Sequence, residues 1–295
     1  KVNIHHNTTN GGGSGGASIA SDKVTIRNSE FNDNQVLSYN DAGGLWINGG
    51  IEMYDSEICR NSAKDVGGFS ISEQNSGRPV HLKNVQVRDN HARNNYGGIY
   101  MYQPNNYNRE FTFDHCEITG NTSSNGNGGG INLRYMVKNK VNLIGTVVSG
   151  NSTTGHGGGI YMDNWGANGT NLVLGQDTVI ENNTAGGSGG GIFADGAYSN
   201  RHTVSISEGV SVRGNTAGGS GGGLWAKVAD IEMTGGEITG NTANYGGGIS
   251  LNYSGWWTEN NTVWNHRNAS LEMTGGKITG NEALTDGGGL HVMKV

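Results

Sequence analysis

The sequence contains very little cysteine and proline, with 2 of each among 295 residues. Cys59 and Cys116 lie far apart and form no CxxC pair, so we expect free thiols and no disulfide scaffold. The chain also lacks any run of about 18 apolar residues, so no transmembrane segment is expected. The net charge of −6 provides no basic field, which argues against nucleic acid as a partner.

Glycine, by contrast, accounts for 54 of the 295 residues. A disordered linker would contain more proline and charge and fewer aromatic residues than this chain, which has 6 Trp and 11 Tyr. Collagen would need glycine at every third position, and that period is absent. The composition therefore indicates a folded chain. Its first residues lack a Met and a signal sequence, and its last residues continue a strand-like pattern, so we expect a piece of a longer protein.

One repeat runs through the whole chain. An apolar residue precedes an Asn by three positions, as in Ile238 and Asn241, and a Gly-Gly pair followed by another apolar residue comes shortly afterwards, as at Ile249. Such self-similarity at a period near 30 residues is typical of solenoids. The repeated Asn residues from the third copy onward are Asn61, Asn90, Asn121, Asn151, Asn183, Asn215, Asn241 and Asn281.

Each repeat contains three short runs in which apolar and polar residues alternate, as at Ile160 and Met162 or Ile231 and Met233. Alternation with period two indicates strands with one buried face. Runs this short cannot form a core alone, so each repeat must stack on the next. We predict an all-β fold with one domain over residues 1–295. It is a right-handed, single-stranded parallel β-helix of about ten coils, each with roughly 30 residues and three short strands.

The repeated polar residues have structural roles in such a fold. An Asn amide can donate and accept, so equivalent Asn residues in successive coils are expected to form an Asn ladder. Gly-Gly permits the corner conformation and the close approach of stacked backbones.

These motifs resemble the repeats of chlamydial polymorphic outer membrane proteins, which alternate FxxN with GG-aliphatic motifs. The stretches "FNDN" at 31–34 and "GGAS" at 15–18 match that pattern as written, and the other copies are looser. The wider resemblance is to right-handed parallel β-helix repeat proteins with a fold like pectate lyases. It implies a secreted or surface-anchored protein, often an adhesin, at an extracellular or cell-surface location.

The residue that follows each Gly-Gly-apolar triplet is expected to face outward. Three of these residues, Tyr161, Phe193 and Trp225, belong to consecutive coils and should stack on one another. Such an aromatic ladder suits the apolar face of a sugar, so these residues are candidates for ligand binding. The alternative is that the ladder merely stabilises the sheet.

Two positions further along the same strands lie Asp163 and Asp195. They should be neighbours about 5 Å apart, near the separation of the carboxyl groups in a retaining glycosidase. They are the catalytic candidates if the chain is an enzyme, and otherwise they cap the insertions that follow them. Arg134 and Lys227 flank the pair, but no motif gives them a role.

Insertions follow this strand in several repeats and should project from one edge of the rod. They carry further candidate ligand-binding aromatics, whose alternative role is to anchor the insertions. These residues are Trp165, Tyr198, Trp256, Trp257 and Trp264.

No cofactor or metal site is predicted, because the 9 His residues form no zinc-binding pattern and the glycine runs lack a phosphate-loop Lys. Three functional hypotheses remain open. The chain is a structural or adhesion module that binds glycan or a host surface, or it is a carbohydrate-active enzyme, either a glycosidase or a lyase. The third hypothesis is a self-assembling fibre subunit, which associates end to end through open strand edges.

Overall fold

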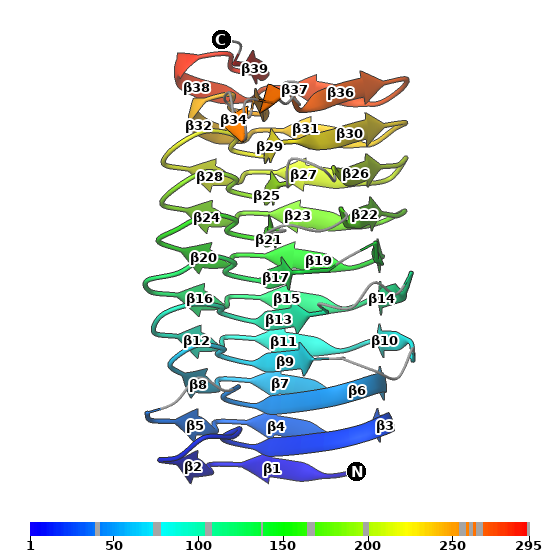
Figure 1. The fold of residues 1–295 in the computed structure, drawn as a ribbon, viewed down its shortest axis with the longest axis vertical. Coiled ribbons are helices and arrows are strands. Elements are labelled where there is room, and N and C mark those ends of the chain that lie inside the picture. Colours follow the sequence, from blue (N-terminus) through cyan, green and yellow to red (C-terminus); the bar gives the residue numbers. More distant parts are fainter. Residues whose placement is uncertain are drawn as a thin grey trace.

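The structure is a computed structural model. It describes residues 1–38, 42–72, 78–103, 108–136, 138–163, 169–196, 201–253, 258–259, 262–263 and 268–293. Within these ranges the chain winds as a parallel β-solenoid without a helix, from one terminus at the bottom to the other at the top (Figure 1). The predicted all-β parallel β-helix is confirmed.

Two stacks of very short strands form sheets of ten strands each. The first stack precedes the repeated Asn and contains β1 (Asn3–His5), β4 (Glu30–Asn32), β7 (Glu57–Cys59), β11 (Gln86–Arg88), β15 (Glu117–Thr119), β19 (Val147–Ser149), β23 (Val179–Glu181), β27 (Ser211–Arg213), β31 (Glu237–Thr239) and β37 (Lys277–Thr279). The second stack follows the Asn and contains β2 (Thr8–Thr9), β5 (Gln35–Val36), β8 (Ser62–Ala63), β12 (His91–Ala92), β16 (Thr122–Ser123), β20 (Ser152–Thr153), β24 (Thr184–Ala185), β28 (Thr216–Ala217), β32 (Thr242–Tyr245) and β38 (Glu282–Asp286).

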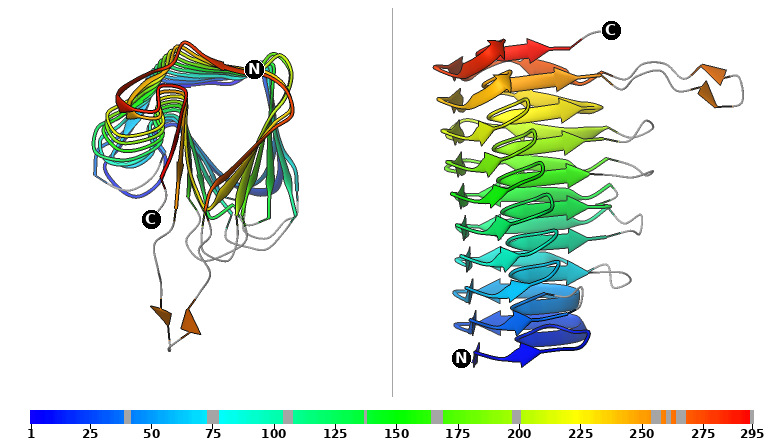
Figure 2. Two further views of the ribbon diagram at one scale, coloured as in Figure 1. Left: turned by 90° about the horizontal axis from the view of Figure 1, so that it is seen from above. Right: turned by 90° about the vertical axis from the view of Figure 1, so that its left-hand side faces the viewer.

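A third sheet has 17 strands and holds two further stacks. The strands that begin after Gly-Gly are β9 (Phe69–Ser72), β13 (Ile99–Tyr102), β17 (Ile131–Arg134), β21 (Ile160–Asp163), β25 (Ile192–Asp195), β29 (Leu224–Lys227), β33 (Ile249–Asn252) and β39 (Leu290–Val292). The strands that follow them in each coil are β10 (Val80–Lys83), β14 (Glu110–Asp114), β18 (Lys140–Ile144), β22 (Asn171–Leu174), β26 (His202–Ile206), β30 (Ala229–Met233) and β36 (Ser270–Met273). In the first two coils β3 (Ala17–Arg27) and β6 (Leu45–Tyr54) run through both stacks. An antiparallel pair, β34 (Thr258–Glu259) and β35 (Thr262–Val263), lies outside the coils (Figure 2).

The coil architecture differs from the prediction in two details. The regular solenoid has about 7 turns rather than about ten, because the fused strands β3 and β6 and the partial coils at the two ends depart from the pattern. Each regular turn also has a fourth strand, the two-residue strand after the Asn, which is too short to show an alternating pattern in the sequence.

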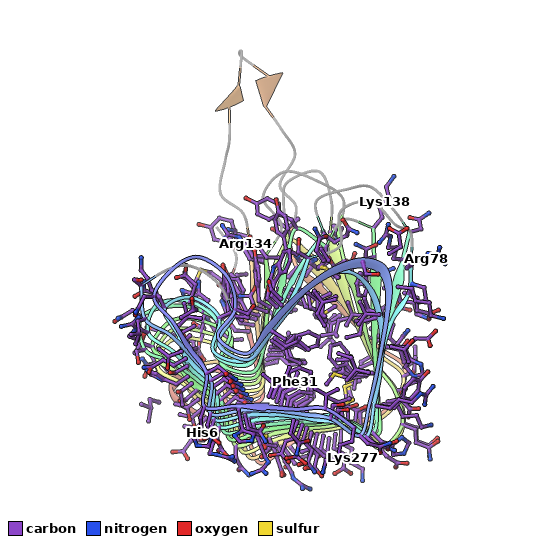
Figure 3. All side chains as sticks on the ribbon, turned by 90° about the horizontal axis from the view of Figure 1, so that it is seen from below. His6, Phe31, Arg78, Arg134, Lys138 and Lys277 are labelled. Carbon is purple, nitrogen blue, oxygen red and sulfur yellow. The ribbon has the colours of Figure 1, made fainter. Side chains whose placement is uncertain are left out.

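The inward residues of the strands fill the bore of the solenoid. Ile160, Met162, Ile231 and Met233 are all fully buried, as predicted from the alternation. They belong to one continuous apolar cluster that extends along the rod, and Figure 3 shows Phe31 inside the bore near its lower end. Cys59 and Cys116 are free and buried, and burial raises the pKa of the Cys116 thiol to about 12.

The predicted Asn ladder is present at one corner of the coil. The Asn151 Nδ2 atom donates to the Asn183 Oδ1 atom at 3.0 Å and to the Ile118 carbonyl at 2.8 Å. Its Oδ1 atom accepts from the backbone N–H and from the Nδ2 atom of Asn121. This pattern recurs along the rod. The side chains of Asn61, Asn90, Asn121, Asn151, Asn183, Asn215, Asn241 and Asn281 are joined in sequence.

The Gly-Gly corner and the Asn ladder form one structural unit. A Cβ atom on Gly159 would lie 3.0 Å from the Nδ2 atom of Asn183 in the next coil, and one on Gly158 would lie 2.6 Å from the Gly190 carbonyl oxygen. The residue before each ladder Asn has a positive φ, as at Gly150 and Asp89. The glycines therefore permit close coil stacking rather than disorder.

The outward face of the Gly-Gly strands is covered at Tyr161 and Phe193, so these two rings face outward from the bore, as predicted, but are not exposed. The covering segments, here called the side loops, connect the two-residue strands to Gly-Gly and gather at one corner outside the bore (Figure 2). Gly157 has a φ of +69°, and a Cβ atom there would lie 2.7 Å from the Tyr161 Cβ atom. Tyr161 and Phe193 are consequently only 9% and 5% exposed.

Candidate functional site

The last residues of five consecutive Gly-Gly strands form a line along one edge of the rod. We call this line the strand-end row, and its members pair in register from coil to coil. All are half-buried, in contrast to the fully buried bore and ladder. The row contains Tyr102, Arg134, Asp163, Asp195 and Lys227.

The predicted aromatic stack is confirmed as a stack. The rings of Tyr161 and Phe193 lie 5.1 Å apart with 5° between their planes, and those of Phe193 and Trp225 lie 4.2 Å apart with 1°. His156, from a side loop, stacks on Phe193 at 4.7 Å. The ring faces therefore contact one another and the side loop, so a flat aromatic surface is not available. Trp225, at the end of the stack, remains half-buried.

Asp163 and Asp195 are neighbours on strands β21 and β25, as predicted. Asp163 accepts a hydrogen bond from the Tyr161 hydroxyl at 3.3 Å, whereas Asp195 forms an ion pair with Lys227 at 3.2 Å. Burial raises the pKa of both carboxyl groups, and the charge of Asp195 raises the pKa of Asp163 further. Lys227 opposes this rise at Asp195, so the two carboxyl groups have different environments.

A second aromatic group lies one to two coils away from Tyr161 and was not identified as a group from the sequence. The rings of Tyr96 and Tyr100 stack at 4.3 Å, and Tyr102 meets Tyr135 edge to face at 5.6 Å. Arg134 donates from Nη1 to the Tyr96 hydroxyl at 2.8 Å. Tyr96 lies in a side loop and Tyr135 lies after a strand, so neither falls on the alternating pattern that the strands follow.

A buried histidine, His202, begins β26, the strand that follows β25 in the chain. His202 is fully buried, and its Nδ1 atom accepts a hydrogen bond from the Thr170 backbone N–H at 3.0 Å. This bond places the ring proton on Nε2 in the neutral form. Burial lowers the pKa of His202 to about 4, so the ring is neutral at physiological pH.

Five predicted ligand-binding residues lie outside the described residues. They are Trp165, Tyr198, Trp256, Trp257 and Trp264. Among the residues that the structure does describe, no group of three or more His, Cys, Asp or Glu side chains is arranged to hold a metal ion. None of these described residues forms a helix with the length and apolar character needed to cross a membrane.

The fold and the Asn ladder define a parallel β-helix repeat protein. The family model for the Chlamydia polymorphic membrane protein repeat matches residues 145–163 and 177–195. Both segments start before a three-residue strand and end at the strand-end row, so they cover the same part of two consecutive coils. Neither a curated protein nor a solved structure matches the chain. The repeats indicate a surface or outer-membrane protein with a β-solenoid.

Proposed function

We propose that the chain is an extracellular adhesion module, a rigid rod that binds glycan or a host surface along the strand-end row. The observation that carries this proposal is the row itself. Its five members comprise four different side chains, Tyr, Arg, Asp and Lys, whereas the residues of the ladder are identical. A solenoid needs only repeated residues to stack, so a varied and half-exposed line of tyrosine and charge is suited to recognition.

The charged residues on the rest of the rod surface can be compared with those of the strand-end row. Charged residues elsewhere pair with the neighbouring coil, as in Arg60 with Asp33 at 2.8 Å and Lys140 with Glu110 at 3.2 Å. The row contains one such pair, Lys227 with Asp195, while Arg134 and Asp163 bond to tyrosine hydroxyl groups instead. Trp225 is the member of the aromatic stack that still offers a half-exposed ring beside the row, with Tyr161 and Phe193 as its support.

The proposal is tested by measuring binding of the labelled chain to a glycan array and to cultured cells. We expect Lys227→Ala and Trp225→Ala to reduce binding at least about fivefold without a large change in melting temperature, since hot-spot side chains dominate an interface. The matched control is Lys277→Ala, which removes a Lys that is 69% exposed on another face. Equal loss in the control, or no binding by the wild-type chain, would contradict the proposal.

A second candidate function is polysaccharide cleavage at the carboxyl pair. The specific observation in its favour is the asymmetry between Asp163, which has no ion pair with the described residues, and Asp195, which pairs with Lys227. A glycosidase needs one carboxyl group that holds a proton and another that stays ionised. Asp163 would be the general acid, and Asp195 the nucleophile or base.

Incubation with a panel of polysaccharides, followed by assays for reducing ends and unsaturated products, tests this second function. We expect Asp163→Asn and Asp195→Asn each to abolish product formation. Cleavage that survives the double substitution would remove this pair from consideration, and no cleavage of any polysaccharide would favour the adhesion module.

A further inference from the structure

Arg134 differs from the four arginines that form ion pairs within the described ranges, whereas Arg93 donates to the Leu37 carbonyl and Arg27 lies over the Tyr54 ring. Arg60, Arg88, Arg201 and Arg213 each contact a carboxylate of a neighbouring coil. Arg134 donates to the Tyr96 hydroxyl and forms no ion pair with a described residue, and its buried Nε atom has no hydrogen-bond partner among them. A half-buried guanidinium without a carboxylate is costly, because charges removed from water are normally paired.

The missing ion pair is not explained by a lack of carboxylates nearby. Asp163 is the register neighbour of Arg134 on the next strand, yet its carboxylate accepts from the Tyr161 hydroxyl instead. The Arg134 guanidinium is turned toward the side-loop residue Tyr96 and lies 5.3 Å from the Tyr135 ring centre. Figure 3 shows Arg134 on the outer side of the rod, outside the bore.

The tyrosines around Arg134 are held in place at some cost. Tyr135 has a φ of 54°, a left-handed conformation that costs a non-glycine residue roughly 1–2 kcal/mol. Several other left-handed positions hold Asn or Asp, which tolerate the conformation, but Tyr135 is bulky. Its ring meets Tyr102 edge to face, and Tyr102 is in turn aligned with Tyr100 at 22°. Strain of this kind at an ordered cluster points to a function for the cluster.

A buried polar side chain without a hydrogen-bond partner among the described residues lies on the same strand as Arg134. Asn132 precedes Arg134 by two positions on β17, so both side chains leave the same face of the strand. Asn132 is fully buried, and neither its Oδ1 nor its Nδ2 atom has a hydrogen-bond partner among the described residues. Asn132 pairs in register with Tyr100 on one side and Tyr161 on the other, so a buried polar side chain lies between the two aromatic groups of this face.

We propose that Arg134, Tyr102 and Tyr135 form a binding site for a carboxylated sugar, an inference that rests on the proposed role in surface recognition. The planar guanidinium is complementary to a carboxylate, with which it forms two parallel hydrogen bonds. The half-exposed rings of Tyr102 and Tyr135 can pack on the apolar face of the sugar ring. Asp163 and Asp195, further along the row, accept hydrogen bonds from hydroxyl groups and repel ligands with several negative charges. The site thus favours a singly charged carboxylate over a phosphate or polysulfate.

The experiment compares each acidic sugar with its own methyl ester, which keeps the ring and removes the charge. Titration calorimetry on the whole chain would use sialyllactose and a hyaluronan tetrasaccharide, each with its ester. We expect at least one acid to bind about tenfold or more tightly than its ester, since charge-assisted hydrogen bonds are the strong ones. Arg134→Gln should lower the affinity for that acid by a similar factor, and Arg134→Lys by less.

The control variant is Arg213→Gln, which removes an arginine that pairs with Glu181 on another face and should leave binding unchanged. Acids and esters that bind equally, or full binding by a folded Arg134→Gln chain, would overturn the site. If Arg134→Gln does not fold, the acid-to-ester ratio of the wild-type chain decides alone. If neither acid binds but the chain still binds cells or neutral glycans, the site is wrong and the adhesion function stands. If the wild-type chain binds no sugar, no cell and no neutral glycan, both the carboxylated-sugar site and the adhesion function are wrong.

Discussion

The Asn corner and the strand-end row lie on the same coils, but residue identity is constant along the corner and varies along the row. At the corner the same amide repeats, and each one satisfies the next through bonds of about equal length, such as 2.9 Å from Asn121 to Asn151 and 3.0 Å from Asn151 to Asn183. At the row the side chain changes from Tyr to Arg, Asp and Lys along the rod, with Asp on two consecutive coils, so the contacts are local and irregular. Uniform residues at the corner hold the coils in register, whereas varied residues at the row can distinguish ligands.

The largest effect should come from interrupting the ladder in the middle of the rod. Asn151→Ala removes four buried hydrogen bonds and leaves the Asn121 backbone N–H and the Ile118 carbonyl without their partner. Each buried group left unsatisfied costs about 1–3 kcal/mol, so we expect a loss of about 3–4 kcal/mol in urea unfolding. Asn125→Ala, at an exposed side-loop position, should cost less than about 0.5 kcal/mol. Similar costs for the two would mean that the ladder does not hold the coils together.

The next largest effect is a pH dependence of stability that arises at His202, on the side of the rod that carries the row and away from the Asn corner. The pKa of His202 is lowered by burial to about 4, below its ordinary 6.5. Between these values the unfolded chain binds the proton and the folded chain does not, so stability falls as pH falls from about 6.5 to about 4. The expected loss is about 3 kcal/mol from this residue. His202→Gln should flatten that part of the stability curve, and His5→Gln, on the exposed first coil, should leave it steep.

Two glycine substitutions should show how closely the corner is packed. Gly158→Ala places a Cβ atom 2.6 Å from the backbone oxygen of Gly190, so the coils must separate, and we expect a cost of about 2–3 kcal/mol. Gly150→Ala meets no atom closer than 3.9 Å, and only its φ of +62° is unfavourable, so about 1 kcal/mol is expected. Gly150→Asn should cost still less, because Asn182 and Asp33 adopt the equivalent conformation. Melting temperatures in the reverse order would contradict the packing argument.

The smallest expected effect on stability comes from two carboxyl groups, Asp163 and Asp33, whose pKa values are shifted in opposite directions. The pKa of Asp163 is raised, chiefly by burial, so its stabilising contribution is present at low pH and is lost as pH rises through the raised value. Asp163→Asn should therefore stabilise the chain slightly at pH 7, by less than about 1 kcal/mol, and not at pH 3. The hydrogen bond from Arg60 lowers the pKa of Asp33, so its contribution is instead lost as pH falls. Asp33→Asn should thus slightly destabilise the chain at pH 7, and effects of the same sign would argue against this electrostatic explanation.

The sequence was sufficient for the parallel β-helix, the Asn ladder and the stacking of Tyr161, Phe193 and Trp225. Each of these features depends on equivalent residues one coil apart, so a period in the sequence becomes a contact in space. The neighbouring positions of Asp163 and Asp195 follow from the same register. The two-residue strands could not be predicted, because segments so short carry no alternation. The number of regular turns was overestimated, because the sequence motifs also occur in the coils where β3 and β6 are fused.

The sequence by itself determined which residues stack, because stacking in a solenoid follows the repeat. Only the tertiary structure decided what covers the stack, since the side loops fold back through positive-φ glycines such as Gly157 and Gly189 and bury Tyr161 and Phe193. It also decided that Arg134 turns to Tyr96, 38 residues earlier, rather than to its register neighbour Asp163. Such contacts join segments with no common period, so they depend on the shape of the folded rod and leave no pattern in the chain.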